Sequence, residues 1–108
     1  MKISQVKELL GFEAVNLPEE DRDIASVFCC DLLSLVMSRA PADCAWVTVM
    51  GNVNTAAVAL LADVACIIVA ENCAVDAQML EKVRQKDIAV FKTELPIFEA
   101  AMAVQKLI

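Results

Sequence analysis

The sequence predicts an α/β fold, a three-layer α/β/α arrangement around a mainly parallel sheet, for a single domain covering residues 1–108. Three segments, residues 44–50, 65–70 and 88–91, are almost continuously apolar, which is typical of strands covered on both faces. Segments with helical periodicity separate these strands and favour right-handed βαβ crossovers. No repeat or linker divides the chain, whose 108 residues suit one core.

The first forty residues are expected to form two helices and two strands. In chain order these are a helix over 2–10, a strand over 12–17, a strand over 25–30 and a helix over 32–39. Gly11 follows the first helix where a stop is expected, and Pro18 closes the first strand. Residues 19–23 form an acidic run that is typical of a solvated loop. Asp31 precedes the second helix, where its carboxylate would cap the N-terminus.

The rest of the chain alternates strands with helices. Three helices are expected between and after the apolar strands, over 55–62, 75–86 and 96–107. Asn54 is the expected N-cap of the first, and Pro96 begins the last, where proline is favoured. Val75, Met79 and Val83 give the middle helix one apolar face opposite a polar one.

The helix over 55–62 differs because it has no polar face, which predicts an element buried on all sides. Either other parts of the chain cover its outer side, or a second subunit does so at Val58, Leu60 and Leu61. The composition favours the second alternative, because 59% of the residues are hydrophobic against roughly 45–50% in an ordinary soluble domain. We therefore expect a homodimer or a higher homo-oligomer.

Charge and hydropathy exclude several classes of protein. With 9 Lys and Arg against 15 Asp and Glu, the chain has no basic surplus for nucleic-acid binding. A mean hydropathy of +0.62 argues against disorder. The longest apolar stretch, residues 56–70, is too short to span a membrane and contains Asp63. The N-terminus lacks the features of a signal peptide, so we expect a cytoplasmic protein.

The residues offer little of the usual catalytic equipment. The chain has no His and no Tyr, and its two glycines form none of the glycine-rich nucleotide-binding motifs. Cys29, Cys30, Cys44, Cys66 and Cys73 have no C-x-x-C spacing, which favours buried packing over a disulfide framework or a metal site. We therefore expect no catalytic residue, no metal and no cofactor.

Polar residues follow the predicted strands at their carboxyl ends, where open parallel sheets bind ligands. The candidate ligand-binding residues are Asp31, Ser34, Gly51, Asn52, Asn54, Glu71 and Asn72. Thr93 follows the last strand in the same way. The alternative is purely structural, because Asp and Asn cap helices and Gly and Asn are common in turns.

Residues 21–37 begin with Asp21-Arg22 and end with Asp31-Leu-Leu-Ser34 and Val36-Met37, and in this pattern they resemble the DRTGG domain family. Members carry Asp-Arg, a hydrophobic residue and Thr-Gly-Gly, followed by a strand that ends in Asp-Leu-Leu-Ser and by a Val-Met helix. This chain has Asp21-Arg22 at the start of that pattern, and Asp31-Leu-Leu-Ser34 and Val36-Met37 at its end.

The resemblance extends over essentially the whole chain. Trp46-Val-Thr-Val49 with Asn54 is similar to the family's second conserved block, and Phe98-Glu-Ala100 continues the likeness. Ala25-Ser-Val27 stands where the family has Thr-Gly-Gly, and Asn52-Val53 stands where many members have His-Pro.

The resemblance implies a fold similar to the N-terminal domains of HPr kinase/phosphorylase and of Mur ligases, where this module is accessory or regulatory. DRTGG domains also occur beside CBS regulatory domains in bacteria and archaea. The expected function is a non-catalytic regulatory or ligand-sensing module that acts as a homo-oligomer or through a partner protein. Two alternatives remain: a small stand-alone enzyme with carboxylate or Cys groups at the strand ends, and a purely structural subunit.

Overall fold

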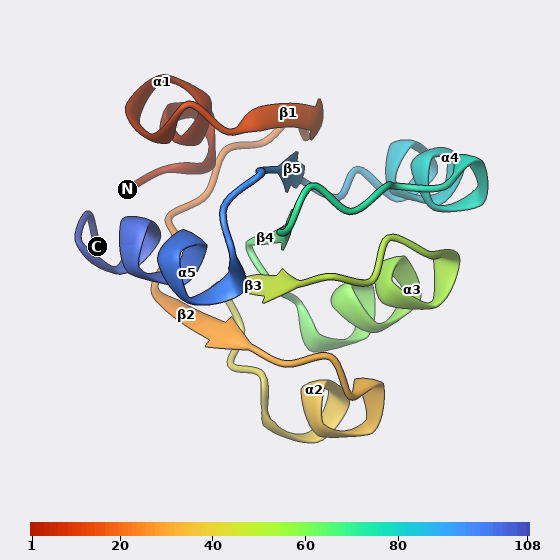
Figure 1. The fold of residues 1–108 in the computed structure, drawn as a ribbon. Coiled ribbons are helices and arrows are strands. Elements are labelled where there is room, and N and C mark those ends of the chain that lie inside the picture. Colours follow the sequence, from red (N-terminus) through yellow and green to blue (C-terminus); the bar gives the residue numbers. More distant parts are fainter.

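The computed structural model describes residues 1–108 and confirms the predicted fold class, with five helices and a five-stranded, mostly parallel sheet (Figure 1). In chain order the elements are η1 (Ile3–Gln5), α1 (Val6–Leu10), β1 (Glu13–Asn16), β2 (Ser26–Cys29), α2 (Leu33–Arg39), β3 (Cys44–Thr48), α3 (Val53–Ala62), β4 (Cys66–Val69), α4 (Ala77–Lys86), β5 (Val90–Lys92) and α5 (Ile97–Gln105).

The strands lie in the order β1-β5-β4-β3-β2. The four strands from β2 to β5 are parallel, and β1 adds to β5 in the antiparallel direction. In the middle of the sheet, Trp46 lies between Phe28 on β2 and Ile67 on β4. The carboxyl ends of the parallel strands therefore meet at one end of the sheet, as the sequence predicts.

Helices cover both faces of the sheet, and Figure 1 shows α2, α3 and α4 on one side with α1 and α5 on the other. Trp46 and Ile67 belong to the core beneath α2, α3 and α4. Ile68 and Phe91 belong to the core on the side of α5, with Val104. Every residue of β3 and β4 is buried, which explains why these strands read as unbroken apolar runs.

The N-terminal helix is shorter than predicted. It begins as the single 3₁₀ turn η1, continues as α1 and ends at Gly11, whose φ of 72° lies in the left-handed region. The chain around η1 docks onto the loop before β2: the Ile3 amide donates to the Arg22 carbonyl, and the Ile24 amide donates to the Met1 carbonyl.

The prediction that the helix over 55–62 is buried on all sides is wrong for the single chain. Its inner side is buried, but Leu60 and Leu61 are 46% and 71% exposed. Val58, which the sequence placed at a subunit interface, is buried in the chain's own core and is therefore not part of its outer surface. The exposed residues of α3 are thus Leu60 and Leu61 in its second half and the polar Asn54 in its first turn.

The predicted burial of the cysteines holds for two of the five. Cys44 and Cys66 are buried in the sheet, Cys30 and Cys73 are half-buried, and Cys29 at the end of β2 is exposed.

None of the helices combines the length and the apolar character needed to cross a lipid bilayer.

Candidate functional site

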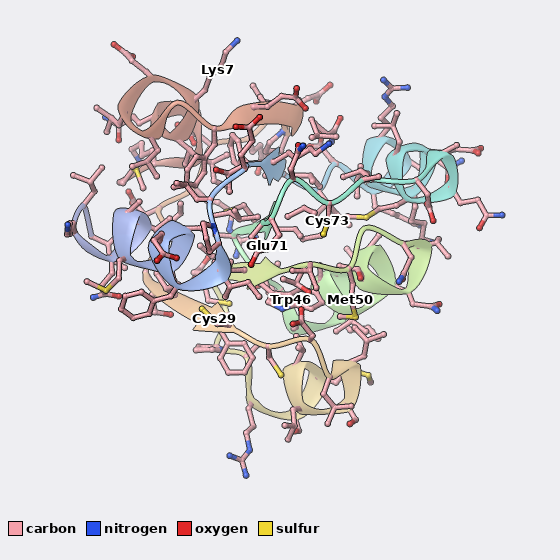
Figure 2. All side chains as sticks on the ribbon, viewed as in Figure 1. Lys7, Cys29, Trp46, Met50, Glu71 and Cys73 are labelled. Atoms are coloured by element: carbon pink, nitrogen blue, oxygen red, sulfur yellow. The ribbon has the colours of Figure 1, made fainter.

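The carboxyl end of the sheet faces the viewer in Figures 1 and 2, and Glu71 lies near its centre. The residues predicted there fall into three groups that follow β2, β3 and β4.

The first group, after β2, contains Asp31 and Ser34. Asp31 does not cap α2 as predicted, because the N-cap is Leu32 and no side chain caps this helix. Instead, the Asp31 carboxylate accepts hydrogen bonds from the Thr48 hydroxyl at 2.6 Å and from the Val49 amide at 3.0 Å. Asp31 thus ties the end of β2 to the end of β3, while Ser34 remains exposed on α2.

The second group, after β3, contains Gly51, Asn52 and Asn54. The predicted cap at Asn54 is wrong by two residues: the Asn52 side chain accepts hydrogen bonds from the amides of Asn54 and Thr55, at 3.0 and 3.2 Å. The side chain of Asn52 is therefore committed to the N-terminus of α3, and Asn54 is exposed.

Gly51 has a packing role. A Cβ atom there would lie 2.8 Å from the carbonyl carbon of Ala74 and closer still to its oxygen. The Gly51 carbonyl also accepts a hydrogen bond from the Asp76 amide at 2.8 Å. The loops before α3 and α4 are in close backbone contact at this point, and only glycine fits.

The third group, after β4, contains Glu71 and Asn72, both exposed and both in the left-handed region, with φ of 60° and 54°. The Glu71 amide donates to the Leu95 carbonyl and the Asn72 amide donates to the Thr93 carbonyl, each at 2.9 Å. Main-chain hydrogen bonds thus hold the loop after β4 against the loop after β5 and leave both side chains free.

An open hollow of about 370 Å³ lies beside the third group. Its lining residues come from the start of β1, the loop after β4 and the end of β5: Gly11, Glu13, Asn72, Lys92, Thr93, Glu94 and Leu95. Of the seven candidate residues, only Asn72 lines this hollow. Asp31 and Asn52 have structural partners instead.

Sequence reasoning missed most of this hollow. Glu13 and Lys92 meet because β1 pairs with β5 in the antiparallel direction, a pairing that no local pattern indicates. Thr93 was the available signal, because it follows the last strand as Asn72 follows the strand before it.

The lining of the hollow is mostly polar. It offers one ammonium group, from Lys92, and two carboxylates, from Glu13 and Glu94, together with the amide of Asn72 and the hydroxyl of Thr93. No group of three His, Cys, Asp or Glu residues in the chain is arranged to hold a metal ion. Hydrogen-bonding recognition of a small polar molecule is the chemistry that this set supports.

Three of the five thiols are poorly suited to nucleophilic chemistry. Partial burial, and next to it the charge of Asp31, raises the pKa of Cys29, the exposed thiol. Burial raises the pKa of Cys44 to about 11 and that of Cys66 to about 12. These three thiols stay protonated at neutral pH, whereas the thiolate is the reactive form.

A second hollow, of about 250 Å³, lies at the amino end of the sheet, where Arg22, Asp63, Lys86 and Asp87 are among its lining residues. Arg22 is already engaged, because its guanidinium donates to the carboxylates of Asp43 and Asp63. Partial burial opposes the charge of Arg22, but these hydrogen bonds outweigh it and raise its pKa. Arg22 thus joins the segment before β2 to the turns that lead into β3 and β4.

No protein-family model matches the chain, and no curated protein matches it. Its fold is shared with a solved structure of the CBS and DRTGG domains of the regulatory region of Clostridium perfringens pyrophosphatase, complexed with the activator diadenosine tetraphosphate. The TM-score is 0.78 and the sequence identity 16%, over 94% of this chain and 44% of that one. The present chain therefore spans less than half of that regulatory structure, and the likeness supports a DRTGG-related fold.

Proposed function

We propose that this chain is a non-catalytic regulatory domain that binds a small polar ligand at the carboxyl end of its sheet and acts as a homo-oligomer or through a partner protein. The observation that carries the proposal is the fold, which over nearly the whole chain matches part of a regulatory region that binds a small-molecule activator. The raised pKa values of Cys29, Cys44 and Cys66 add support, because they disfavour an enzyme that uses one of these three thiols.

The hollow at the carboxyl end is the proposed ligand site. It lies where parallel sheets bind ligands, and main-chain hydrogen bonds from Glu71 and Asn72 hold its loops in place before any ligand arrives. Because the lining contains one lysine, Lys92, and two glutamates, Glu13 and Glu94, the site has no surplus of positive charge. We therefore propose a ligand with hydroxyl, amide or amine groups and little negative charge, such as a nucleoside or an amino acid, in preference to a polyphosphate.

Thermal unfolding in the presence of candidate ligands tests this proposal, because a ligand that binds only the folded state raises the Tm. The set should contain nucleosides, amino acids and, as polyanions, AMP and diadenosine tetraphosphate. We expect a shift with a compound of the first two classes, and a loss of affinity of about tenfold or more in Lys92→Met, which removes the ammonium group.

Lys106→Met is the matched control, because Lys106 follows α5 and does not line the hollow. The ligand-binding part of the proposal is contradicted if no compound raises the Tm, or if Lys92→Met and Lys106→Met bind the ligand equally well. A shift produced by diadenosine tetraphosphate alone would contradict the proposed ligand class.

A further inference from the structure

The two outer strands of the sheet differ in how their free edges are protected. β1 carries Glu13, and its register with β5 is irregular between Ala14 and Asn16. The Asn16 side chain donates to the carbonyls of Val83 and Ile88, at 3.2 and 2.8 Å, and so fastens the strand to the end of α4. Charge and irregular pairing are features that prevent an edge strand from pairing with another chain.

β2 has none of these features. Its sequence, Ser-Val-Phe-Cys, contains no charge and no proline, and all four of its residues are in regular register with β3. The Ala25 amide donates to the Asp43 carbonyl of the neighbouring chain segment. On the outer side, the N-terminal residues pair with the segment before β2 only as far as Ile24, whose amide donates to the Met1 carbonyl. Because successive peptide groups of a strand point to opposite sides, those of Ser26 and Phe28 also face outward, and they are free to pair.

The two helices that flank this edge, one on each face of the sheet, carry exposed apolar side chains. On one side, Leu35 and Met37 of α2 are exposed, Met37 by 55%. On the other side, α5 lies against β2 and β3 and exposes Phe98, by 69%, and Met102. In Figure 1, β2 is the outer strand between α5 and α2. We call the edge and its two apolar borders the β2 side.

The β2 side carries few charges. Asp31 follows β2, Arg39 ends α2, and Glu99 is the only charged side chain within α5. Just before β2, Lys2 and Asp23 form an ion pair with each other. The chain as a whole has a net charge of −6, so two copies repel each other over most of their surface. A surface with few charges is one on which a second, identical copy can bind with few like-charge contacts.

We propose that a second copy of this chain binds to the β2 side, with the two β2 strands antiparallel about a two-fold axis. The two sheets then form one continuous sheet, α2 meets α2 of the partner, and α5 meets α5 of the partner. This arrangement uses the same surface on both copies, as a two-fold dimer requires. It rests on the homo-oligomer of the proposed function and specifies its surface, independently of the ligand site.

Such a dimer needs a substantial contact area. A standard interface buries about 800 Å² per partner, roughly a seventh of the 5666 Å² that this chain exposes. A phenylalanine side chain offers on the order of 150–250 Å², so Phe98 alone supplies on the order of 100 Å². Further exposed apolar side chains on the elements of this side are those of Leu32, Leu35, Met37 and Met102.

Light scattering coupled to gel filtration, at micromolar concentrations of the full chain, tests the proposal. We expect twice the mass of the 11.7 kDa chain. Phe98→Glu on α5 and Met37→Glu on α2 each place two carboxylates against each other across the two-fold axis, so the dimer dissociation constant should rise at least tenfold in each. Both residues are exposed, so the folded monomer should survive, as circular dichroism will show.

Leu61→Glu is the matched control, because Leu61 is equally exposed but lies on α3, away from the β2 side. It should leave the dimer intact. A monomeric wild-type chain overturns the proposal. So does a dimer that Leu61→Glu dissociates while Phe98→Glu and Met37→Glu do not, since that result assigns the interface to α3.

Amide hydrogen exchange tests the strand pairing itself. The Ser26 and Phe28 amides should exchange slowly in the dimer and much faster in Phe98→Glu. Free exchange of both amides in a wild-type dimer overturns the antiparallel pairing. Ligand-induced Tm shifts measured on Phe98→Glu then separate the two proposals, because a failure of dimerisation leaves the ligand site in place.

Discussion

The two ends of the parallel strands are held together by different forces. At the carboxyl end, loops are joined mainly by backbone contacts, such as those of Gly51 with Ala74 and Asp76 and those of Glu71 and Asn72 with the loop after β5. At the amino end, charged side chains join the segments. Four aspartates there accept hydrogen bonds from other segments: Asp21 from Ser4, Asp43 and Asp63 from Arg22, and Asp87 from the Glu19 amide.

The difference is linked to the scarcity of glycine. Three aspartates lead into the strands β3, β4 and β5 and have a positive φ: 65° at Asp43, 56° at Asp63 and 57° at Asp87. Glycine adopts this conformation most easily, but aspartate tolerates it and adds a carboxylate. The chain therefore turns into three strands with residues that also cross-link the amino end. Close backbone contacts fix the loops at the carboxyl end, whereas charged side chains stabilise the amino end.

The largest expected loss of stability comes from a substitution at the carboxyl end. Gly51→Ala forces a Cβ atom into the Ala74 carbonyl, and because both partners are backbone, relief requires the two loops to separate. We expect a loss of about 3 kcal/mol in the free energy of unfolding, measured by urea denaturation. Gly11→Ala is the control: its Cβ meets nothing within 4 Å, and only the φ of 72° opposes it, which costs roughly 1 kcal/mol. Equal losses in the two variants would contradict the close contact at Gly51.

The next largest loss of stability is expected from a substitution at the amino end. Arg22→Met removes hydrogen bonds to the carboxylates of Asp43 and Asp63 and one of 3.1 Å to the Asp63 carbonyl. Because the side chain is about one-third exposed, we expect a loss of about 1–2 kcal/mol at low salt. Arg22→Lys should recover less than half, since lysine lacks the planar fork.

The salt concentration should affect the two ends of the sheet differently. The loss caused by Arg22→Met should shrink at about 1 M salt, where exposed charges are screened, while the loss caused by Gly51→Ala should not change. An Arg22→Met loss that is independent of salt would show that packing, and not charge, holds the amino end.

A smaller effect separates the two asparagines at the carboxyl end. Asn52→Ala removes the cap of α3 and should cost about 1 kcal/mol, because two amides lose their acceptor. Asn54→Ala should change stability little, since Asn54 is exposed and alanine favours the helix. Urea denaturation measures both variants. A larger loss of unfolding free energy in Asn54→Ala than in Asn52→Ala would show that Asn54 is the N-cap, as the sequence predicts.

These cases show where sequence reasoning succeeds and where it fails. The buried strands could be predicted because burial on both faces requires unbroken apolar runs, as in β3 and β4. The cap of α3 could not be resolved, because Gly51-Asn-Val-Asn54 offers two asparagines and only the backbone at Asn52 is extended. Two further contacts depend on which strands pair, and a local sequence pattern cannot predict them. These are the hydrogen bond from Thr48 to Asp31 and the pairing of Glu13 with Lys92.

The smallest expected effect concerns Asp21 and pH. The hydrogen bond from the Ser4 hydroxyl lowers the pKa of the Asp21 carboxyl below its ordinary 3.8, so the folded state favours the charged form. Its stabilising contribution is therefore complete above that value and is lost as the pH falls through the lower pKa of the folded state. Asp21→Asn should be less stable than wild type by a constant amount above about pH 5, and the two curves should converge in acid. Ser4→Ala is the control, because it removes the hydroxyl donor and keeps the Asp21 carboxylate. Urea denaturation at a series of pH values measures all three proteins, and an Asp21→Asn curve that stays parallel to that of wild type would show that the Ser4 contact does not stabilise the amino end through charge.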